Sequence, residues 1–149
     1  MVTSTSQKNM PMTGDRFWEI RIPSRMLHGR REVEKFVSRA VAWGVSHEES
    51  LALRNSLHEA LVNAVRHGNQ GHASRSVRIC YRFLSDDIFI EVEDEGRGFD
   101  RAAVPDPTTD ENRIRPGGRG LLMMRHFMNS VEYNERGNCV TMRRTCQRG

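Results

Sequence analysis

Asp94 stands at the end of an alternating apolar row, where a carboxylate needs a partner. It has the same strand parity as the apolar residues of segment 88–92, so its side chain is expected to point toward the apolar face. Placing a carboxylate there is costly unless a donor hydrogen-bonds it, and the amino group of adenine is a suitable donor. Gly96 and Gly98 follow, and glycines let a backbone approach a ligand closely. A strand-end aspartate that caps the glycine turn is the alternative interpretation.

Glu59 and Asn63 are four residues apart in a helical sequence, on one face beside a leucine stripe. Asparagine is a mediocre helix former, and its carbonyl oxygen is a hard ligand that suits Mg²⁺. Glu59 can orient or deprotonate a hydroxyl or water near the same metal. The alternative is a polar, solvated helix face. His67, one turn further on, is interpreted as pairing with the helix end and not as a metal ligand.

A glycine cluster directly precedes the segment LLMMRHFM, which has the character of a helix. Unpaired amides at a helix N-terminus attract phosphate, and the glycines, Gly118 and Gly120 among them, let the chain wrap an anion. Arg115 and Arg119 stand beside them, where each can pair with phosphate oxygens. An ordinary turn is the alternative, and neither the Walker lysine pattern nor a G-x-G-x-x-G fingerprint fits the segment.

Hydrophobic periodicity predicts the elements that would position these residues. Alternation predicts an edge strand at 16–22 and two hairpins, with strands at 77–83, 88–94, 131–135 and 139–143. Apolar residues at helical spacing predict a helix to about Trp43, with Ser24 as its N-cap. A second helix begins with a capping box at Ser46–Glu49 and ends near Gly68.

The predicted order is strand, two helices, hairpin, loop, helix, hairpin. Helices that cover one face of a mixed, largely antiparallel sheet make a two-layer α+β sandwich, which is the expected fold class. Residues 1–14 are interpreted as a flexible tail before a single domain at 15–149. The long aperiodic segment at 99–117 is interpreted as a lid.

Composition narrows the classes of function only a little. No apolar stretch approaches the roughly 18 residues of a membrane span, and there is no signal-peptide core, so we expect a cytoplasmic protein. The net charge of +4 comes mainly from scattered arginines, which argues against direct nucleic-acid binding. The three cysteines form no metal-type spacing and are expected to be reduced, apolar side chains; they are Cys80, Cys139 and Cys146.

The segments EALVNAVRHGN, EDEGRGFD and GGRGLLMMRHFMNSVEY, in this order, resemble the N, G1 and G2 boxes of the GHKL (Bergerat-fold) ATPases. The sequence looks most like the stand-alone anti-sigma-factor serine kinases of the stress-response and sporulation type. This resemblance covers most of residues 16–144, including the last hairpin. It implies a Bergerat ATP-binding fold with the lid closing over the triphosphate.

The resemblance also implies roles for the residues of the boxes. It implies that Asn63 binds Mg²⁺, Glu59 is the presumed base, and Asp94 hydrogen-bonds adenine. The glycines that shape the pocket would be Gly96, Gly98, Gly118 and Gly120. As partners it implies a sigma factor, which such proteins sequester, and a small anti-anti-sigma (STAS-type) protein, which they phosphorylate on serine. Family members often work as homodimers.

Two departures from the family pattern leave phosphate transfer and the identity of the partners open. The lid sequence PDPTTDENRIRPGG is only loosely similar to the family's lid, and Arg119 is a charged residue inside the second glycine box. A nucleotide-gated binding switch without transfer is therefore a second hypothesis. A detached histidine-kinase catalytic domain ranks below both, since no helical segment with a phosphoacceptor histidine is visible.

Overall fold

In the computed structural model, residues 6–7, 15–96 and 116–147 are described. Within these described residues, two short strands and four long ones combine with three helices and one π-helical segment. In chain order these elements are β1 (Ser6–Gln7), β2 (Arg16–Pro23), α1 (Met26–Trp43), α2 (His47–Val62), η1 (Asn63–Gly68), β3 (Ser76–Leu84), β4 (Asp87–Asp94), α4 (Pro116–Phe127), β5 (Ser130–Tyr133) and β6 (Cys139–Thr145).

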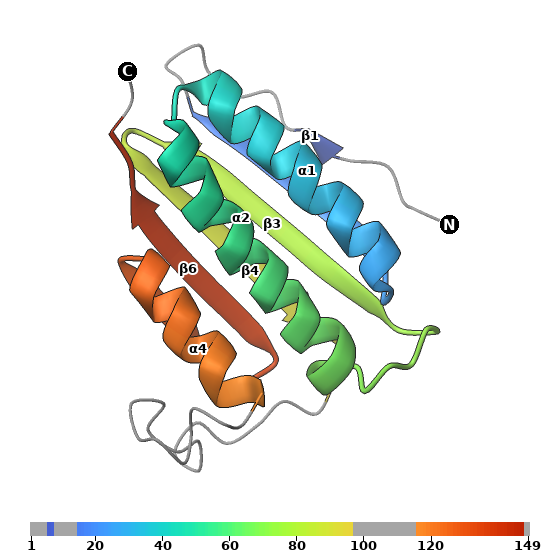
Figure 1. Cartoon of the computed structure of the whole chain (residues 1–149). Helices are drawn as coiled ribbons and strands as arrows, with labels where there is room; N and C mark the ends of the chain where they lie inside the picture. The colour runs from blue at the N-terminus through green and yellow to red at the C-terminus, as the bar shows by residue number, and fades with distance from the viewer. Residues whose placement is uncertain (1–5, 8–14, 97–115, 148–149) are drawn as a thin grey trace.

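The strands form one sheet in the order β1-β2-β3-β4-β6-β5, and every described pairing is antiparallel. The helices α1, α2 and α4 lie together on one face of this sheet (Figure 1). The two-layer α+β fold and both hairpins predicted from the sequence are confirmed. The strand predicted at 16–22 is confirmed as β2, but its predicted place at the edge of the sheet is wrong, because β2 pairs with β1 on one side and with β3 on the other.

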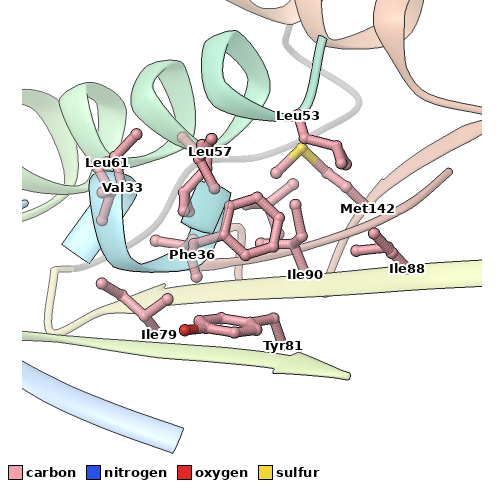
Figure 2. Packing of buried hydrophobic residues seen from close by; sticks show 14 of the residues in the cluster. Val33, Phe36, Leu53, Leu57, Leu61, Ile79, Tyr81, Ile88, Ile90 and Met142 are labelled. Atoms are coloured by element: carbon pink, nitrogen blue, oxygen red, sulfur yellow. The ribbon is translucent and has the colours of Figure 1, made fainter. Parts of the chain in front are cut away.

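The hydrophobic core lies between the sheet and the helices, as the apolar periodicities of the strands and helices predict. Every second residue of the strands faces the helices, and these side chains meet the apolar stripes of α1 and α2. Figure 2 shows Phe36 of α1 lying between the leucines of α2 and the sheet residues Tyr81 and Ile90. Burying each such side chain contributes about 1.5–3 kcal/mol. The helix layer is therefore held firmly on the strands that carry the candidate site.

The start of α1 differs from the prediction. Its N-cap residue is Arg25, which makes no side-chain capping bond, so the prediction that Ser24 caps the helix is wrong. Ser24 is buried, and its hydroxyl accepts a hydrogen bond from the side-chain amide of Asn69 at 3.0 Å instead. The Ser24 hydroxyl, which the local sequence assigns to capping α1, makes a tertiary hydrogen bond with Asn69 instead.

The start of α2 agrees with the prediction in its main feature. Ser46 is the N-cap, and its hydroxyl accepts a hydrogen bond from the Glu49 amide at 3.1 Å. The Glu49 carboxylate does not complete the box, because it contacts the C-terminal segment, accepting from the Gln147 amide at 3.2 Å and from Arg144. The last strand is thereby tied to the second helix.

Two further features concern the described residues as a whole. No helix among them is both long enough and apolar enough to cross a membrane. The cysteines are all free thiols, and burial raises the pKa of Cys80 to about 11 and that of Cys139 and Cys146 to about 12. They are protonated at neutral pH, as expected of packing residues rather than nucleophiles.

Candidate functional site

Segments distant in the sequence meet at one end of the sheet. They are the end of α2 with η1, the end of β4 and the beginning of α4, which lie together at the lower end of the molecule in Figure 1. Each carries one of the residue groups that the sequence singled out. The contacts among them define the candidate site.

Glu59 of α2 and Gly120 of α4 bring the first and third groups together. A Cβ atom added to Gly120 would overlap Oε1 of Glu59, and its next neighbours would be the Cδ and Cγ atoms of the same side chain. Gly120 is buried, whereas Glu59 is only partly buried. The absence of a side chain at Gly120 therefore makes the space that the Glu59 carboxylate occupies.

Asp94, the last residue of β4, faces the helix layer as its parity predicted. Its main chain is fixed by Asn138, whose carbonyl accepts from the Asp94 amide at 2.9 Å and whose side chain donates to the Asp94 carbonyl at 3.0 Å. One carboxylate oxygen accepts from the Gly96 amide at 2.8 Å. Burial raises the pKa of the Asp94 carboxyl, although this hydrogen bond and the charge of Arg136 act the other way. A further hydrogen-bond donor to the Asp94 carboxylate would favour the ionised form of this group.

Gly68 and Gly96 touch each other beside this carboxylate. A Cβ atom on Gly96 would overlap the carbonyl oxygen of Gly68, and one on Gly68 would overlap the carboxylate of Asp94. The end of η1 and the turn after β4 therefore pack backbone against backbone, which only glycine permits. Gly96 was predicted from the sequence as a pocket residue, whereas Gly68 was interpreted only as a helix end.

Asn63 begins η1, a π-helical segment that continues α2 to Gly68. The amide of Asn69 donates to the Ala64 carbonyl at 2.8 Å, the five-residue spacing of a π-helix. Such wider turns occur frequently at functional sites because they shift side chains around the helix. His67 is exposed in this segment. The simple α-helical stacking predicted for residues 59, 63 and 67 therefore ends at Asn63.

Tyr133 of β5 is a site residue that the sequence analysis missed. Its hydroxyl is hydrogen-bonded to Asn63, and its surroundings include the charges of Asp94 and Glu59. Burial raises the pKa of Tyr133 to about 12, so the hydroxyl keeps its proton at neutral pH. Tyr133 pairs with Val140, which pairs with Val92 on its other side, so the ring lies in the row of the sheet that faces the helices. Its strand parity was the only local signal.

The remaining predicted residues are described in part or not at all. Gly118 and Arg119 lie in the first turns of α4, where only the backbone is described. Helix α4 begins at Pro116, so the glycines belong to the helix and the prediction that they precede it is wrong. Gly98 and Arg115 lie outside the described residues, as does the predicted lid at 99–117 except for its last two residues.

The comparison with known families and proteins agrees with this architecture. The family described as "Histidine kinase-like ATPase domain" matches residues 24–144 of the chain. Serine-protein kinase RsbW of Listeria monocytogenes is 28% identical over 127 residues, which covers 80% of this chain and 79% of that protein. Serine/threonine-protein kinase BtrW of Bordetella bronchiseptica is 32% identical over 81 residues, or 52% of this chain and 56% of the relative.

A third relative carries a different kind of name. An anti-sigma F factor of Clostridium perfringens is 33% identical over 92 residues, which covers 60% of this chain and 66% of that protein. All three relatives are similar at low identity, and the family match extends over most of the chain, from before α1 into β6. The two-layer fold, the meeting of the three motifs and this match agree, and the chain belongs to the family of histidine kinase-like ATPase domains, the GHKL ATPases.

Proposed function

We propose that this protein is a Mg·ATP-dependent serine/threonine kinase of the anti-sigma-factor type. In this proposal it sequesters a sigma factor and phosphorylates a serine of a small anti-anti-sigma partner. The observation that carries it is the meeting of Glu59, Asn63 and Asp94 at one end of the sheet, next to Gly120 of α4. The names of the RsbW and BtrW relatives support a kinase, and that of the anti-sigma F factor supports a sigma-factor partner.

The chemistry of the described residues fits ATP. A half-buried carboxylate with a raised pKa is suited to accept a hydrogen bond from the adenine amino group, since that bond favours the ionised form. The first turn of α4 offers backbone amides to the phosphates, and an anion at a helix N-terminus is favoured by the helix dipole. The close-packed glycines leave room at the points where side chains would intrude.

The same residues fit Mg²⁺ through oxygen ligands. Among the residues described, no cluster of three or more His, Cys, Asp or Glu side chains is suited to hold a metal ion. Mg²⁺ bound with a nucleotide typically takes one or two protein oxygens, with phosphates and water as the other ligands. Asn63 would supply one such oxygen. The ion, when bound, would neutralise charge on the phosphates during transfer.

Each side chain then has a role in the proposed reaction. Asp94 would hold the base, and the amides at the start of α4 would hold the phosphates. Glu59 would accept the proton of the incoming serine hydroxyl, whose oxygen forms the new bond to the terminal phosphorus as the bond to ADP breaks. Positioning and charge stabilisation would supply most of the rate.

Replacing Asn63 with alanine is expected to remove the Mg²⁺ dependence of ATP binding. In the wild type we expect ATP to bind at least about tenfold more tightly with Mg²⁺ than without it, the effect of about 1.4 kcal/mol. Calorimetric titration with ATP, with and without Mg²⁺, measures both affinities. Asn55→Ala, at an exposed position of α2, is the matched control and should behave as wild type. Wild-type curves for Asn63→Ala would reject Asn63 as the metal ligand.

Replacing Tyr133 with phenylalanine is expected to weaken Mg·ATP binding about three- to tenfold, the value of one hydrogen bond. In this proposal the Asn63 amide N–H donates to the Tyr133 oxygen, which leaves the carbonyl oxygen of Asn63 for the metal, and phenylalanine removes this orienting contact. Affinity for ATP in EDTA should stay unchanged, since the ring remains. Equal losses with and without Mg²⁺ would mean that Tyr133 acts on the nucleotide and not through Asn63.

A nucleotide-gated switch without phosphate transfer is the second candidate. The similarity to an anti-sigma F factor, a name that states action against a sigma factor and does not mention a kinase, favours it. A pull-down from native extract in ATP and in ADP, followed by mass spectrometry of the captured proteins, tests both candidates. A kinase yields a partner that gains a phosphoserine on incubation with ATP, whereas a switch yields nucleotide-dependent capture without modification. Capture of neither a sigma factor nor its antagonist would contradict both.

A further inference from the structure

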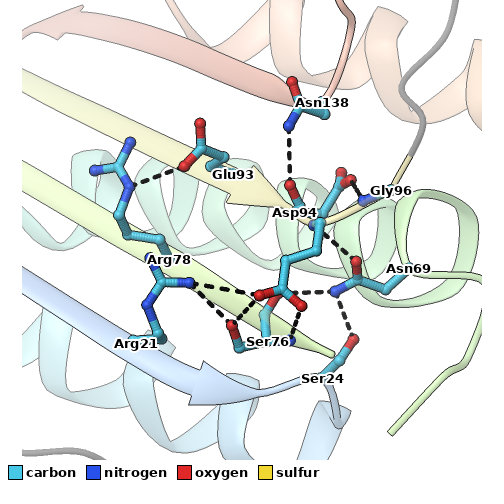
Figure 3. A network of polar contacts seen from close by, with 10 residues as sticks. Arg21, Ser24, Asn69, Ser76, Arg78, Glu93, Asp94, Gly96 and Asn138 are labelled. Atoms are coloured by element: carbon cyan, nitrogen blue, oxygen red, sulfur yellow. Dashed lines mark hydrogen bonds and ion pairs between the residues drawn. The ribbon is translucent and has the colours of Figure 1, made fainter. Parts of the chain in front are cut away.

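The side chain of Asn69 is fully buried directly after η1, and both ends of its amide are used. Its Oδ1 accepts from the Glu95 amide at 2.8 Å. Its Nδ2 donates to Ser24 Oγ at 3.0 Å and to the Ser76 carbonyl at 2.9 Å. Figure 3 shows this side chain between Ser24, Ser76 and the end of the strand that carries Asp94. The residue is 0% exposed.

These bonds join segments that are far apart in the chain. Ser24 precedes α1, Ser76 begins β3, and Glu95 follows β4. The Glu95 carboxylate closes the arrangement by accepting from the amide of Ser76 at 3.0 Å and from its hydroxyl at 3.1 Å. A buried amide that supplies both a donor and an acceptor fits this position, whereas an apolar side chain would leave the Glu95 amide without the acceptor that Asn69 supplies.

The same contacts determine where the carboxylate of Asp94 lies. Glu95, held by Asn69, is the next residue in the chain, and the Gly96 amide donates to Asp94 Oδ1 at 2.8 Å. Gly68, which precedes Asn69, lies against both Asp94 and Gly96 without room for a side chain. The turn after β4 is thus held by a side-chain amide on one side and by a backbone contact on the other.

We propose that Asn69 is a positioning residue for base recognition: its buried amide holds the turn Asp94–Gly96 against the end of η1 and so directs the Asp94 carboxylate at the adenine amino group. This inference rests on the proposed ATP-binding function. Asn69 does not touch the base itself.

The comparison of ATP with GTP separates positioning from general stabilisation. The adenine 6-amino group donates to a carboxylate, whereas guanine has a 6-oxo group there, an acceptor that the carboxylate repels. A displaced Asp94 loses the favourable contact with ATP and also part of the repulsion of GTP. Loss of positioning therefore reduces the ATP/GTP affinity ratio, whereas a merely loosened fold weakens both nucleotides in proportion.

The test compares Asn69→Ala with Asn55→Ala, the same change at an exposed position of α2. Calorimetry in Mg²⁺ should show ATP affinity about tenfold lower in Asn69→Ala and GTP affinity changed less than about threefold. Asn55→Ala should match the wild type. In the nucleotide-free protein, hydrogen exchange at the Glu95 amide should be faster in Asn69→Ala, because its acceptor is gone.

Four results would overturn the inference. Unchanged ATP affinity in folded Asn69→Ala does so, as does an equal loss for ATP and GTP. Wild-type protein that binds neither nucleotide overturns the proposed function and this inference together, which distinguishes that failure from the first two. If Asn69→Ala does not fold, Ser24→Ala removes one acceptor of the amide and should lower the ATP/GTP ratio by about two- to threefold. An unchanged ratio in that variant also overturns it.

Discussion

Replacing Glu59 with glutamine is expected to lower phosphate transfer to the serine of the partner by about 100- to 10,000-fold, the usual contribution of a general base. Glutamine has the same shape as glutamate but accepts a proton far less readily. Affinity for Mg·ATP should change less than about threefold, because base recognition is assigned to Asp94 and metal binding to Asn63. Transfer is measured with radiolabelled ATP and the purified partner, and affinity by calorimetry.

The position of Glu59 is the reason why its replacement should lower phosphate transfer without changing Mg·ATP affinity. Its carboxylate fills the space that Gly120 leaves open between α2 and α4. Glu48→Gln is the matched control, since this glutamate is exposed at the start of the same helix and should leave transfer unchanged. Equal transfer by wild type and Glu59→Gln would reject Glu59 as the base. Absence of transfer in both would favour the nucleotide-gated switch.

Replacing Gly96 with alanine is expected to lower the free energy of unfolding by about 2–3 kcal/mol, the upper part of the range for overpacking a close-packed position. The added Cβ would overlap the carbonyl oxygen of Gly68, and a backbone atom cannot turn aside as a flexible side chain can. Relief requires the turn after β4 to move away from η1, which displaces Asp94. ATP affinity should therefore fall at least about tenfold as well. Urea denaturation and calorimetry measure the two effects.

Gly29→Ala is the control for this prediction. Gly29 is also buried, but a Cβ there would lie 3.5 Å from Leu61 Cδ1, an ordinary van der Waals contact. Because Gly29 is inside α1, alanine should raise the free energy of unfolding by up to about 1 kcal/mol. The same chemical change is thus expected to have opposite signs at the two glycines. A Gly96→Ala protein as stable as wild type, with unchanged ATP affinity, would show that the two backbones separate easily.

The site could be predicted from the sequence wherever a side chain's direction depends on its own element. Asp94 faces the helix layer because β4 alternates, and Ser46 caps α2 because its neighbours are helical. Ser24 shows where this reasoning fails: it has the residue type of an N-cap, yet the N-cap position falls on Arg25 and the Ser24 hydroxyl bonds to Asn69. Local rules do not include competing partners from distant segments.

The contacts between segments could not be predicted in the same way. In the sequence, Asn69 only follows the predicted end of the second helix near Gly68, and Tyr133 is one more residue of the strand predicted at 131–135. Their positions depend on how η1 leaves α2 and on which residue of β6 stands opposite β5. Hydrophobic periodicity predicts neither the π-helical turn nor the strand register, because both result from the packing of the whole domain.

The sequence by itself determined the order of the elements, the face that each presents to the core, and the three motifs from which ATP binding was inferred. Only the tertiary structure decided that Glu59 lies against Gly120, that Gly68 touches Gly96, and that the Asn69 amide joins the surrounding segments. The physical reason is the range of the interactions. Periodicity and capping act within a few residues of the chain, whereas steric fit and buried hydrogen bonds act between surfaces that meet only after folding.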